Sequence, residues 1–594
     1  MKKLLTLFLA FVSIDAFSQL YVTGSTNYVY VKGTVVFVKQ DINLQANTNF
    51  YLRNEGQLVQ GTTSTSANKG AGKVSVFQEG TVNNYAYNYW CSPVGNASAA
   101  TGNESFGITM LGSPTSVTAT TAAANIGSFD GFASPLTISN RWIYKFLSST
   151  VYSDWIYVGS TSTIGAGEGF TMKGTSGTDS TIIEGNSVQN NSGSAQRYDF
   201  RGKPNDGNIT VNTAPDKFTL TGNPYPSALN VNAFLLDAGN SAMVANAYYW
   251  EQDKTVNSHY VAQYVGGYGT YSPVSLGSNG VYVPATFNTY NGDGSLNANG
   301  ATSNTNTSIL RKYAPVGQGF MIYGAPTGSS VTLKNSHRAY YKESTSPNSY
   351  FARNASAVTT AVTDNADEII SHLRFNISIN NQFTRQIALI LIPSATDGVD
   401  NGIDALSPDG DLPNDTYFFL NDNRYVIEGV AFDVSKRIPL GLKVTENTSF
   451  KFSLLESVNF DTAQNIYIYD GLDNSYHDIK NGNYEVMLST GVYNNRFEIT
   501  FTNVALGVNQ NTADNLLVVQ DNSLHMLRIS NPDAQNLAIM ALYDISGRQV
   551  FSKQKLGTEA AFEFPTVALS EGVYLVKLTT DDNKVLTQKI IIKK

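Results

Sequence analysis

The sequence has very little cysteine, little charge and no long hydrophobic run. Cys91 is the one cysteine among 594 residues, so no internal disulfide can form and the domains must be held by their cores. Charged residues make up only 14% of the chain, and the net charge is −8 with no basic cluster. A basic face for nucleic acid is therefore excluded, and no nucleic-acid partner is expected. No run reaches the roughly 18 apolar residues that a membrane-spanning helix needs.

Glycine and tyrosine are abundant instead, at 49 and 34 residues. Short apolar, β-branched and aromatic runs alternate with Gly, Asn, Ser and Asp along the whole chain, which is typical of exported all-β proteins. A single hydrophobic core stops growing at about 250 to 300 residues, so the chain must contain several domains. The sequence predicts a multi-domain, all-β protein.

The chain begins with a pattern typical of a signal peptide. Met1-Lys-Lys3 is positively charged, Leu4–Ile14 is mostly apolar, and Ala16-Phe-Ser18 has small residues at the cleavage positions. We expect residues 1–18 to be removed before Gln19, which is not the cysteine of a lipoprotein anchor. The remaining chain is expected to be secreted.

Residues 19–82 contain runs of about three to five residues that recur every eight or so, closer together than in an ordinary sandwich. This spacing favours a short parallel β-solenoid-like segment. A meander of hairpins is the alternative.

Residues 83–345 contain three blocks that occur twice in the same order, which indicates a duplicated β-rich region. Chance similarity among glycine-rich turns is the alternative. A Gly-x-Gly-Phe turn suits a close backbone approach, and no helix follows it to bind phosphate. The paired blocks are Tyr89–Val94 with Leu220–Tyr225, Trp142–Phe146 with Tyr248–Trp250, and Gly167–Gly174 with Gly317–Gly324.

A polar stretch at 344–349 marks a boundary, after which residues 346–510 contain longer runs with alternating apolar and polar positions. Such alternation places one face in a core and one in water. It predicts a β-sandwich, although the fold alone does not give a function.

Residues 511–594 carry three ordered blocks: Leu542-Tyr-Asp-Ile-Ser-Gly-Arg-Gln-Val550, Leu569-Ser-Glu-Gly-Val-Tyr-Leu-Val-Lys577 and Lys589-Ile-Ile-Ile-Lys593. Their order and spacing resemble the type A C-terminal sorting domain of the type IX secretion system of Bacteroidetes. An ordinary terminal immunoglobulin-like domain is the alternative. Both interpretations predict an immunoglobulin-like sandwich.

The resemblance implies an outer-membrane partner and a destination. A protein of this kind is recognised by the type IX translocon and its outer-membrane shuttle protein, and it reaches the cell surface or the medium. Recognition would use a strand edge or the basic terminus. The residues that the resemblance assigns to the sorting signal are Gly547, Gly572, Tyr574, Lys589, Lys593 and Lys594.

An acidic, glycine-containing loop is the best candidate for a metal site. Carboxylates clustered in such a loop are ligands that calcium prefers, although the spacing does not match an EF-hand. Asp and Gly are also common in solvated turns, which is the competing interpretation. The candidate calcium ligands are Asp397, Asp400, Asp404, Asp409 and Asp411.

All four tryptophans lie between residues 90 and 250, where exposed rings would bind the apolar faces of sugars and buried rings would belong to a core. No common catalytic motif occurs. We therefore expect a non-enzymatic surface or secreted protein, an adhesin or structural component that contacts a glycan or a neighbouring protein. The alternative is a secreted polysaccharide-active enzyme, or a glycan-binding accessory protein, in which carboxylates meet only in space.

Overall fold

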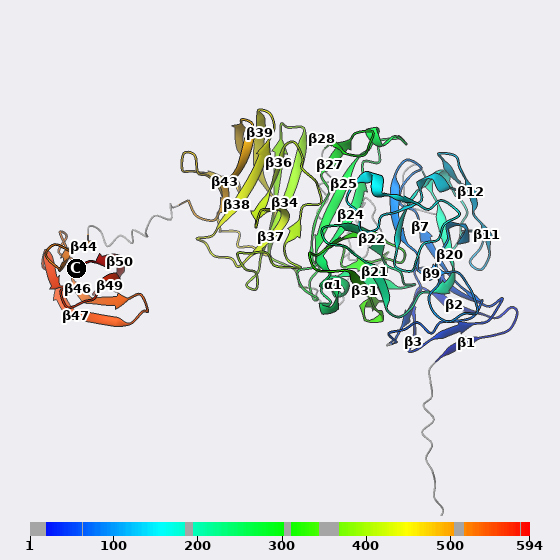
Figure 1. The fold of residues 1–594 in the computed structure, drawn as a ribbon, viewed down its shortest axis with the longest axis horizontal. Helices are drawn as coiled ribbons and strands as arrows, with labels where there is room; N and C mark the ends of the chain where they lie inside the picture. The colour runs from blue at the N-terminus through cyan, green and yellow to red at the C-terminus, as the bar shows by residue number, and fades with distance from the viewer. Residues whose placement is uncertain are drawn as a thin grey trace, which may run out of the picture. The chain divides into compact units, whose positions relative to one another are not determined.

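The computed structural model describes residues 19–61, 63–184, 194–301, 310–343, 368–503, 516–581 and 584–594. The expected signal peptide and the expected boundary at 344–349 lie outside these ranges. Strands dominate throughout (Figure 1), as the composition predicts. The chain divides into two compact units, Met1–Thr502 and Asn503–Lys594, so the second unit begins a few residues before the predicted boundary. No helix in the described ranges is long and apolar enough to span a membrane.

The first strands form a short parallel solenoid, as predicted. β1 pairs with β4, β2 with β5 and β3 with β6, all in parallel and with offsets of 21 or 22 residues. A meander would pair these strands antiparallel, so that alternative is excluded. The strands are β1 (Leu20–Val22), β2 (Tyr28–Lys32), β3 (Val35–Val38), β4 (Ile42–Leu44), β5 (Asn49–Arg53), β6 (Gln57–Gln60) and β7 (Lys73–Glu79).

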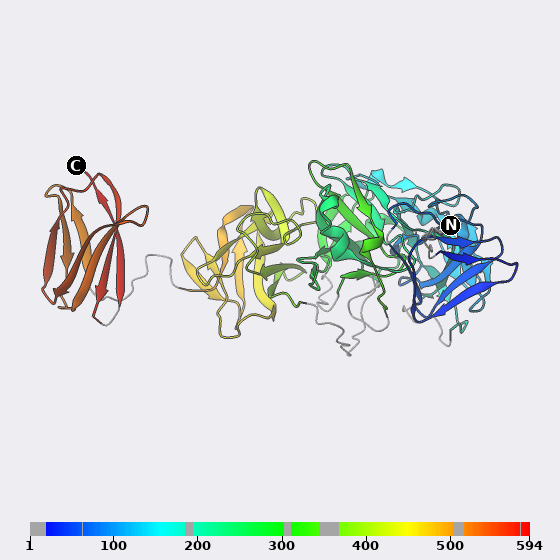
Figure 2. The same cartoon turned by 90° about the horizontal axis from the view of Figure 1, so that it is seen from below.

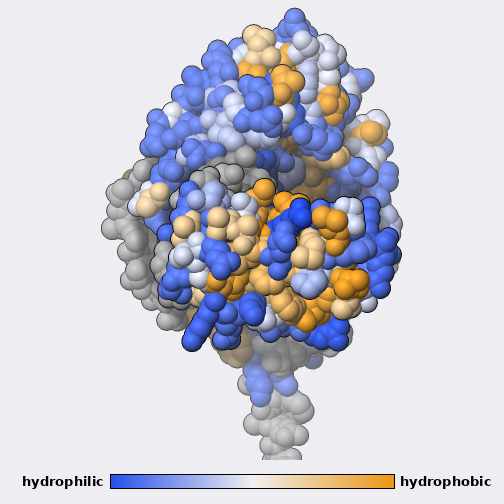
Figure 3. All heavy atoms as spheres, turned by 90° about the vertical axis from the view of Figure 1, so that its left-hand side faces the viewer, coloured by the Kyte–Doolittle hydropathy of each residue, from blue (hydrophilic) through white to orange (hydrophobic). Residues whose placement is uncertain are grey.

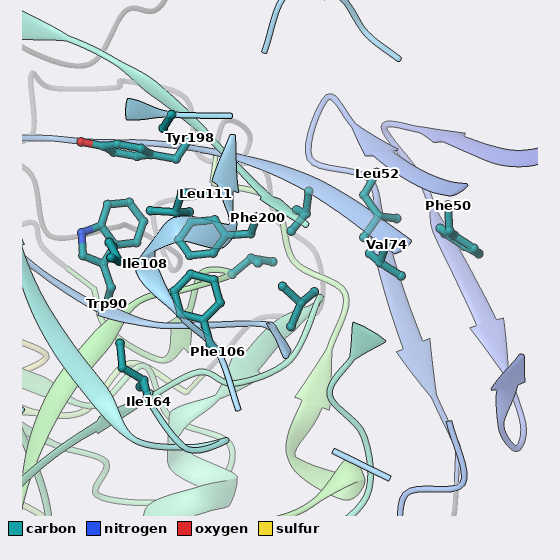
Figure 4. Packing of buried hydrophobic residues seen from close by; sticks show 14 of the residues in the cluster. Phe50, Leu52, Val74, Trp90, Phe106, Ile108, Leu111, Ile164, Tyr198 and Phe200 are labelled. Carbon is teal, nitrogen blue, oxygen red and sulfur yellow. The ribbon is translucent and has the colours of Figure 1, made fainter. Parts of the chain in front are cut away.

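The solenoid continues into the next region without a break in the sheet. β7 pairs in parallel with β5 on one side and antiparallel with β20 (Arg197–Pro204) on the other. The predicted boundary after residue 82 therefore does not separate two sheets. Both regions also contribute to one core, in which Trp90 lies beside Tyr198 and Phe200 (Figure 4).

The predicted duplication is confirmed by strand pairing. β8 (Tyr87–Cys91) pairs antiparallel with β17 (Gly169–Lys173), and β22 (Phe218–Gly222) pairs antiparallel with β30 (Gly319–Gly324). Cys91 lies opposite Gly169, and Gly222 lies opposite Gly319. These are the positions that the repeated blocks equate.

The glycines of each repeat pack against a strand of the other repeat. A Cβ atom on Gly169 would lie 2.7 Å from the carbonyl oxygen of Thr221, on β22. A Cβ atom on Gly319 would lie 2.7 Å from the backbone nitrogen of Trp90, on β8. This reciprocal backbone contact explains why both Gly-x-Gly-Phe turns end in glycine before the phenylalanine.

Other elements of the duplicated region form smaller sheets around these pairs. The second repeat adds a seven-stranded sheet in the order β22-β30-β24-β25-β27-β28, with β26 on β25. The remaining elements are β9 (Val94–Gly95), η1 (Ile108–Met110), β10 (Leu111–Pro114), β11 (Thr120–Ala122), β12 (Ala124–Ile126), β13 (Gly131–Ala133), β14 (Leu136–Ser139), η2 (Asn140–Trp142), β15 (Tyr144–Lys145), η3 (Tyr152–Asp154), β16 (Ile156–Tyr157), β18 (Thr175–Thr178), β19 (Ser194–Ala195), β21 (Ile209–Asn212), β23 (Ala228–Asn230), α1 (Val231–Leu235), η4 (Ala238–Asn240), β24 (Met243–Gln252), η5 (Val261–Gln263), β25 (Val265–Ser272), β26 (Val281–Val283), β27 (Phe287–Tyr290), β28 (Leu296–Ala301), β29 (Tyr313–Ala314), β31 (Ser330–Leu333), η6 (Asn335–His337) and β32 (Arg338–Ala339).

The predicted sandwich is a single eleven-stranded sheet that curves around one core. A backbone hydrogen bond of 3.3 Å from Leu454 N to Ile479 O brings the far parts of the sheet together, so it approaches a barrel. Its strands are β33 (His372–Ile379), β34 (Phe383–Leu391), β35 (Ala405–Leu406), β36 (Asp415–Leu420), β37 (Asn423–Val430), β38 (Arg437–Val444), β39 (Thr448–Val458), β40 (Tyr467–Asp470), β41 (Ser475–Asp478), β42 (Tyr484–Leu488) and β43 (Gly491–Thr500).

The C-terminal unit is a two-sheet antiparallel sandwich with its own core (Figure 2), as an immunoglobulin-like domain requires. One sheet has the order β44-β45-β48 and the other β47-β46-β49-β50. The strands are β44 (Leu517–Asp521), β45 (Met526–Ser530), β46 (Leu537–Asp544), β47 (Gln549–Gly557), β48 (Ala561–Pro565), β49 (Gly572–Thr580) and β50 (Val585–Ile592).

Candidate functional site

An aromatic cavity of about 430 Å³ lies among the strands of the duplicated region. Both repeats supply its walls, because β8 and η2 belong to the first repeat and β24 and β25 belong to the second. Its aromatic lining is Tyr87, Tyr89, Trp142, Tyr144, Phe146, Tyr152, Trp155, Phe218, Trp250, Tyr264, Tyr268 and Tyr290. We call this feature the aromatic cavity.

Strand alternation explains how one sequence block supplies both a core and this cavity. Successive side chains of a strand point to opposite faces, so Tyr89 and Trp90 on β8 point in opposite directions. Trp90 is fully buried in the first core, whereas Tyr89 lines the cavity. On β24, Tyr249 belongs to another core, whereas Trp250 lines the cavity.

The rings that line the cavity hold one another in place. Tyr89 stacks on Trp250 with 6.5 Å between centroids and 8° between planes, and Trp250 meets Tyr268 edge-on at 5.2 Å. The hydroxyls of Tyr89 and Tyr268 are 2.7 Å apart. Trp155 packs on Phe146 at 4.7 Å. The walls are therefore ordered before any ligand arrives.

The four tryptophans differ in their burial. Trp90 is 0% exposed and belongs to the core. Trp142, Trp155 and Trp250 are only partly buried, and all three line the cavity. The core interpretation thus fits Trp90, whereas the other three line the cavity without being exposed, and Trp155 and Trp250 also pack against a buried cluster.

A buried lysine lies behind three of the cavity rings. Lys173 Nζ is 4.0 Å from the centroid of the Trp142 ring and 4.9 Å from those of Tyr87 and Tyr264. It donates hydrogen bonds to Tyr264 Oη (2.7 Å) and His259 Nδ1 (3.2 Å). Burial lowers the pKa of Lys173 to about 7, although the charge of Asp130 acts in the opposite direction.

The phenols around the cavity stay neutral at physiological pH. Burial raises the pKa of Tyr87, Tyr89 and Tyr268 above the usual value for tyrosine. The described residues that line the cavity include no carboxylate. The lining thus offers aromatic faces and neutral hydroxyls to a ligand.

One sequence feature points to Lys173, although it belongs to no common motif. Lys173 lies in the repeated block Gly167–Gly174, and its counterpart in Gly317–Gly324 is Tyr323. A lysine in a block that otherwise packs as a core strand is unusual, because a buried charge needs a partner. The partners His259 and Asp130 are far away in sequence and follow no recognisable spacing.

The structure gives the aspartates of the predicted calcium loop separate partners. Among described residues, no group of three or more His, Cys, Asp or Glu side chains is arranged to hold a metal ion. Asp409 lies 2.6 Å from Arg385 Nη1, whereas Asp411 pairs with Arg424 (2.9 Å) and Lys443 (2.6 Å). Asp409 and Asp411, which the sequence suggested as calcium ligands, are therefore paired with basic side chains.

The other three aspartates of that loop organise the local backbone. Asp397 pairs with Lys436, and Asp400 accepts a hydrogen bond from Thr396 N at 2.6 Å. Asp404 accepts from the backbone nitrogens of Asp400 (2.5 Å) and Gly429 (2.6 Å). Burial raises the pKa of Asp404 to about 6, and these two hydrogen bonds oppose the shift. Asp397 and Asp400 thus fit a turn at the surface, whereas Asp404 is 1% exposed and does not.

The residues assigned to a sorting signal have different environments in the C-terminal unit. Tyr574 is 7% exposed, packs in the core and donates a hydrogen bond to Ser570 O (2.9 Å), so it stabilises the fold. Gly547 has a φ of +79° in the turn between β46 and β47, and Gly572 begins β49. The exposed members of the set are Gly547, Lys589, Lys593 and Lys594.

The C-terminal unit also displays many apolar side chains. Figure 3 shows apolar residues gathered on the face that this unit turns to the viewer. Its exposed large apolar residues are Leu517, Val519, Leu524, Ile539, Ile545, Phe551, Val567, Leu575 and Ile591. Apolar surface of this extent is typical of a binding face.

Comparison with known proteins gives family matches without an assigned activity. Residues 12–501 match a family model described as Domain of unknown function (DUF8693), and residues 506–592 match a second one, DUF8694. No curated protein matches the chain. One similar solved structure is titled a polysaccharide lyase, with 12% identity and a TM-score of 0.11. The match covers 38% of this chain and 40% of that one, so this chain spans less than half the length of the lyase.

Proposed function

This chain belongs to the family described as Domain of unknown function (DUF8693), and we propose that it is an exported, non-enzymatic surface protein that binds a carbohydrate in the aromatic cavity. The observation that carries the proposal is the lining: three half-buried tryptophans and seven tyrosines surround one cavity of about 430 Å³. That volume lies within the usual range of about 300 to 1,000 Å³ for small-molecule sites.

The chemistry of the lining suits a sugar. A pyranose ring has faces of C–H groups and a rim of hydroxyls, so it needs flat apolar surfaces and neutral hydrogen-bonding groups nearby. Aromatic faces such as that of Trp250 supply the first, and tyrosine hydroxyls supply the second. Because the rings are already packed on one another, a bound sugar does not have to order them.

A glycan array probed with the full-length secreted chain tests this proposal. We expect binding to a restricted set of glycans and loss of that binding in Trp250→Ala. Phe37→Ala is the matched control, because Phe37 is a 63% exposed aromatic residue on β3, outside the cavity. Binding that survives Trp250→Ala unchanged contradicts the proposal. Incubation of the selected glycan with the protein separates binding from cleavage, since an enzyme releases shorter products.

We propose further that the C-terminal unit delivers the chain through the type IX secretion system. The three sequence blocks, the immunoglobulin-like fold and the exposed basic terminus support this role. The translocon and its outer-membrane shuttle protein are the partners, and the cell surface or the medium is the destination.

Two variants separate folding of this unit from recognition of its end. Removing residues 585–594 deletes β50, which contributes Ile590 and Ile592 to the core, and should retain the protein in the periplasm. Replacing Lys589, Lys593 and Lys594 with alanine keeps that core and tests whether the export machinery recognises the basic charge. Normal appearance of the deletion variant outside the cell contradicts the proposal.

A further inference from the structure

Lys173 is a buried cation for which the structure shows no anionic partner in direct contact. Its side chain is 4% exposed, and no described carboxylate lies within 4.0 Å of Nζ. The nearest charge that acts on it is Asp130, which lies beyond His259 and bonds to His259 Nε2 at 2.9 Å. A buried charge without a counter-ion is costly, so its retention calls for a partner.

The side chain of Lys173 shares a face with the cavity lining. Residues two apart on a strand point to the same side, and Thr171, two positions before Lys173 on β17, lines the aromatic cavity. The rings of Tyr87, Trp142 and Tyr264, which also line it, surround Nζ. Two of the three ammonium protons have acceptors, His259 Nδ1 and Tyr264 Oη, and the face of the Trp142 ring lies 4.0 Å from Nζ.

We propose that the aromatic cavity recognises an acidic saccharide, one that carries a carboxylate, and that Lys173 supplies the compensating positive charge. This inference rests on the proposed carbohydrate binding and names the chemical class of the carbohydrate. The rings hold the sugar face, and the carboxylate lies toward Lys173. The exposed Arg141, stacked 4.6 Å from the Phe129 ring that packs on His259, adds positive charge to the same end.

The other groups that face Lys173 do not replace the anion. Tyr87 and Tyr264 stay neutral, since burial raises the pKa of both. Burial and the neighbouring Lys173 charge lower the pKa of His259, so near neutral pH it accepts from Lys173 at Nδ1 and directs Nε2 to Asp130. A carboxylate at the cavity end would favour the charged form of Lys173, so the Lys173 amine would take up a proton on binding.

The experiment compares oligomers of galacturonate, glucuronate and mannuronate with their carboxyl-reduced forms. By calorimetric titration of the full-length chain at pH 6.5, we expect one acidic oligomer to bind at least tenfold more tightly than its reduced counterpart. Lys173→Met should remove that preference, so that the acidic oligomer and its reduced form bind with similar affinity. Lys145→Met is the matched control, because Lys145 already has an anionic partner, Glu168, at 2.8 Å.

A measurement on the unaltered protein guards against misfolding of the variant. With a lysine pKa of about 7, the protonated fraction falls about eightfold between pH 6.5 and pH 8. Affinity for the acidic oligomer should fall by about that factor, and affinity for the reduced form should not. Equal affinity for both forms, or a preference that survives in Lys173→Met, overturns this inference and leaves carbohydrate binding intact. Failure to bind either series also overturns this inference, whereas the glycan array decides separately whether the cavity binds another carbohydrate.

Discussion

Replacing Lys173 with methionine should change how the stability of the first unit depends on pH. Burial lowers the pKa of Lys173 to about 7 in the folded chain, whereas an unfolded lysine titrates near about 10.4. Between these values the unfolded chain holds a proton that the folded chain lacks. Because stability rises with pH wherever the unfolded state binds more protons, the wild-type protein should become more stable from pH 7 upward.

The size of the effect follows from the two pKa values. The slope approaches about 1.4 kcal/mol per pH unit once the folded lysine has lost its proton, so the interval from pH 7 to pH 9 adds about 2 kcal/mol to the free energy of unfolding. Lys173 is 4% exposed, so solvent screens this contribution little. Methionine has a similar length and no charge, so Lys173→Met should lack this increment.

Tryptophan fluorescence during urea unfolding is the suitable assay. All four tryptophans lie between residues 90 and 250, in the first unit, so the signal does not report on the C-terminal unit. Unfolding curves at pH 7, 8 and 9 give the free energy for each protein, provided that the transition is two-state. Parallel pH dependences of the wild type and Lys173→Met would refute the account of Lys173 as a buried, uncompensated amine.

Three further outcomes are expected. Gly319→Ala should lower the free energy of unfolding by about 1 to 3 kcal/mol, because the added Cβ meets the backbone of Trp90. Gly127→Ala is the control and should leave the free energy of unfolding unchanged, because nothing lies within 4 Å of its added Cβ. Equal urea midpoints for the two variants would contradict the reciprocal packing. Arg385→Met leaves two buried carboxylates without their cation and should cost about 3 to 5 kcal/mol in thermal unfolding, and a melting temperature like that of the wild type would count against this ion-pair network. Asp411→Asn removes a 72% exposed charge and should change the free energy of unfolding by no more than about 0.5 kcal/mol. A larger loss of stability in this variant would support the calcium interpretation. A chelator that lowers the melting temperature of the wild type would support it as well.

Local patterns predicted much of the fold. Short runs and closely spaced turns indicated the parallel solenoid, because its paired strands lie near one another in sequence. The repeated Gly-x-Gly-Phe blocks indicated equivalent strands, although the pairs that form, β8 with β17 and β22 with β30, join strands far apart in sequence. The curvature of the eleven-stranded sheet was not predictable in the same way. Apolar and polar residues alternate in the same way along the strands of a sandwich and of a near-barrel. Which of the two folds forms depends on which strands, distant in sequence, pair with one another.

The candidate site could be predicted only in part. Concentration of tryptophan between residues 90 and 250 pointed to the right region, but strand direction decides which ring faces the cavity, as Tyr89 and Trp90 show. Lys173 meets His259 only through tertiary packing. In the acidic loop, the partner of Asp409 is Arg385, which lies on β34 outside the loop, so no local spacing reveals it.

Calorimetric titration of the array-selected glycan into the wild type, Trp250→Ala and Phe37→Ala tests the central claim most directly. Truncation of a central aromatic contact costs about 2 kcal/mol or more, so Trp250→Ala should bind at least about tenfold more weakly. Phe37→Ala should match the wild type. Equal affinity for the three proteins would show that the glycan binds elsewhere and would contradict the assignment of the aromatic cavity.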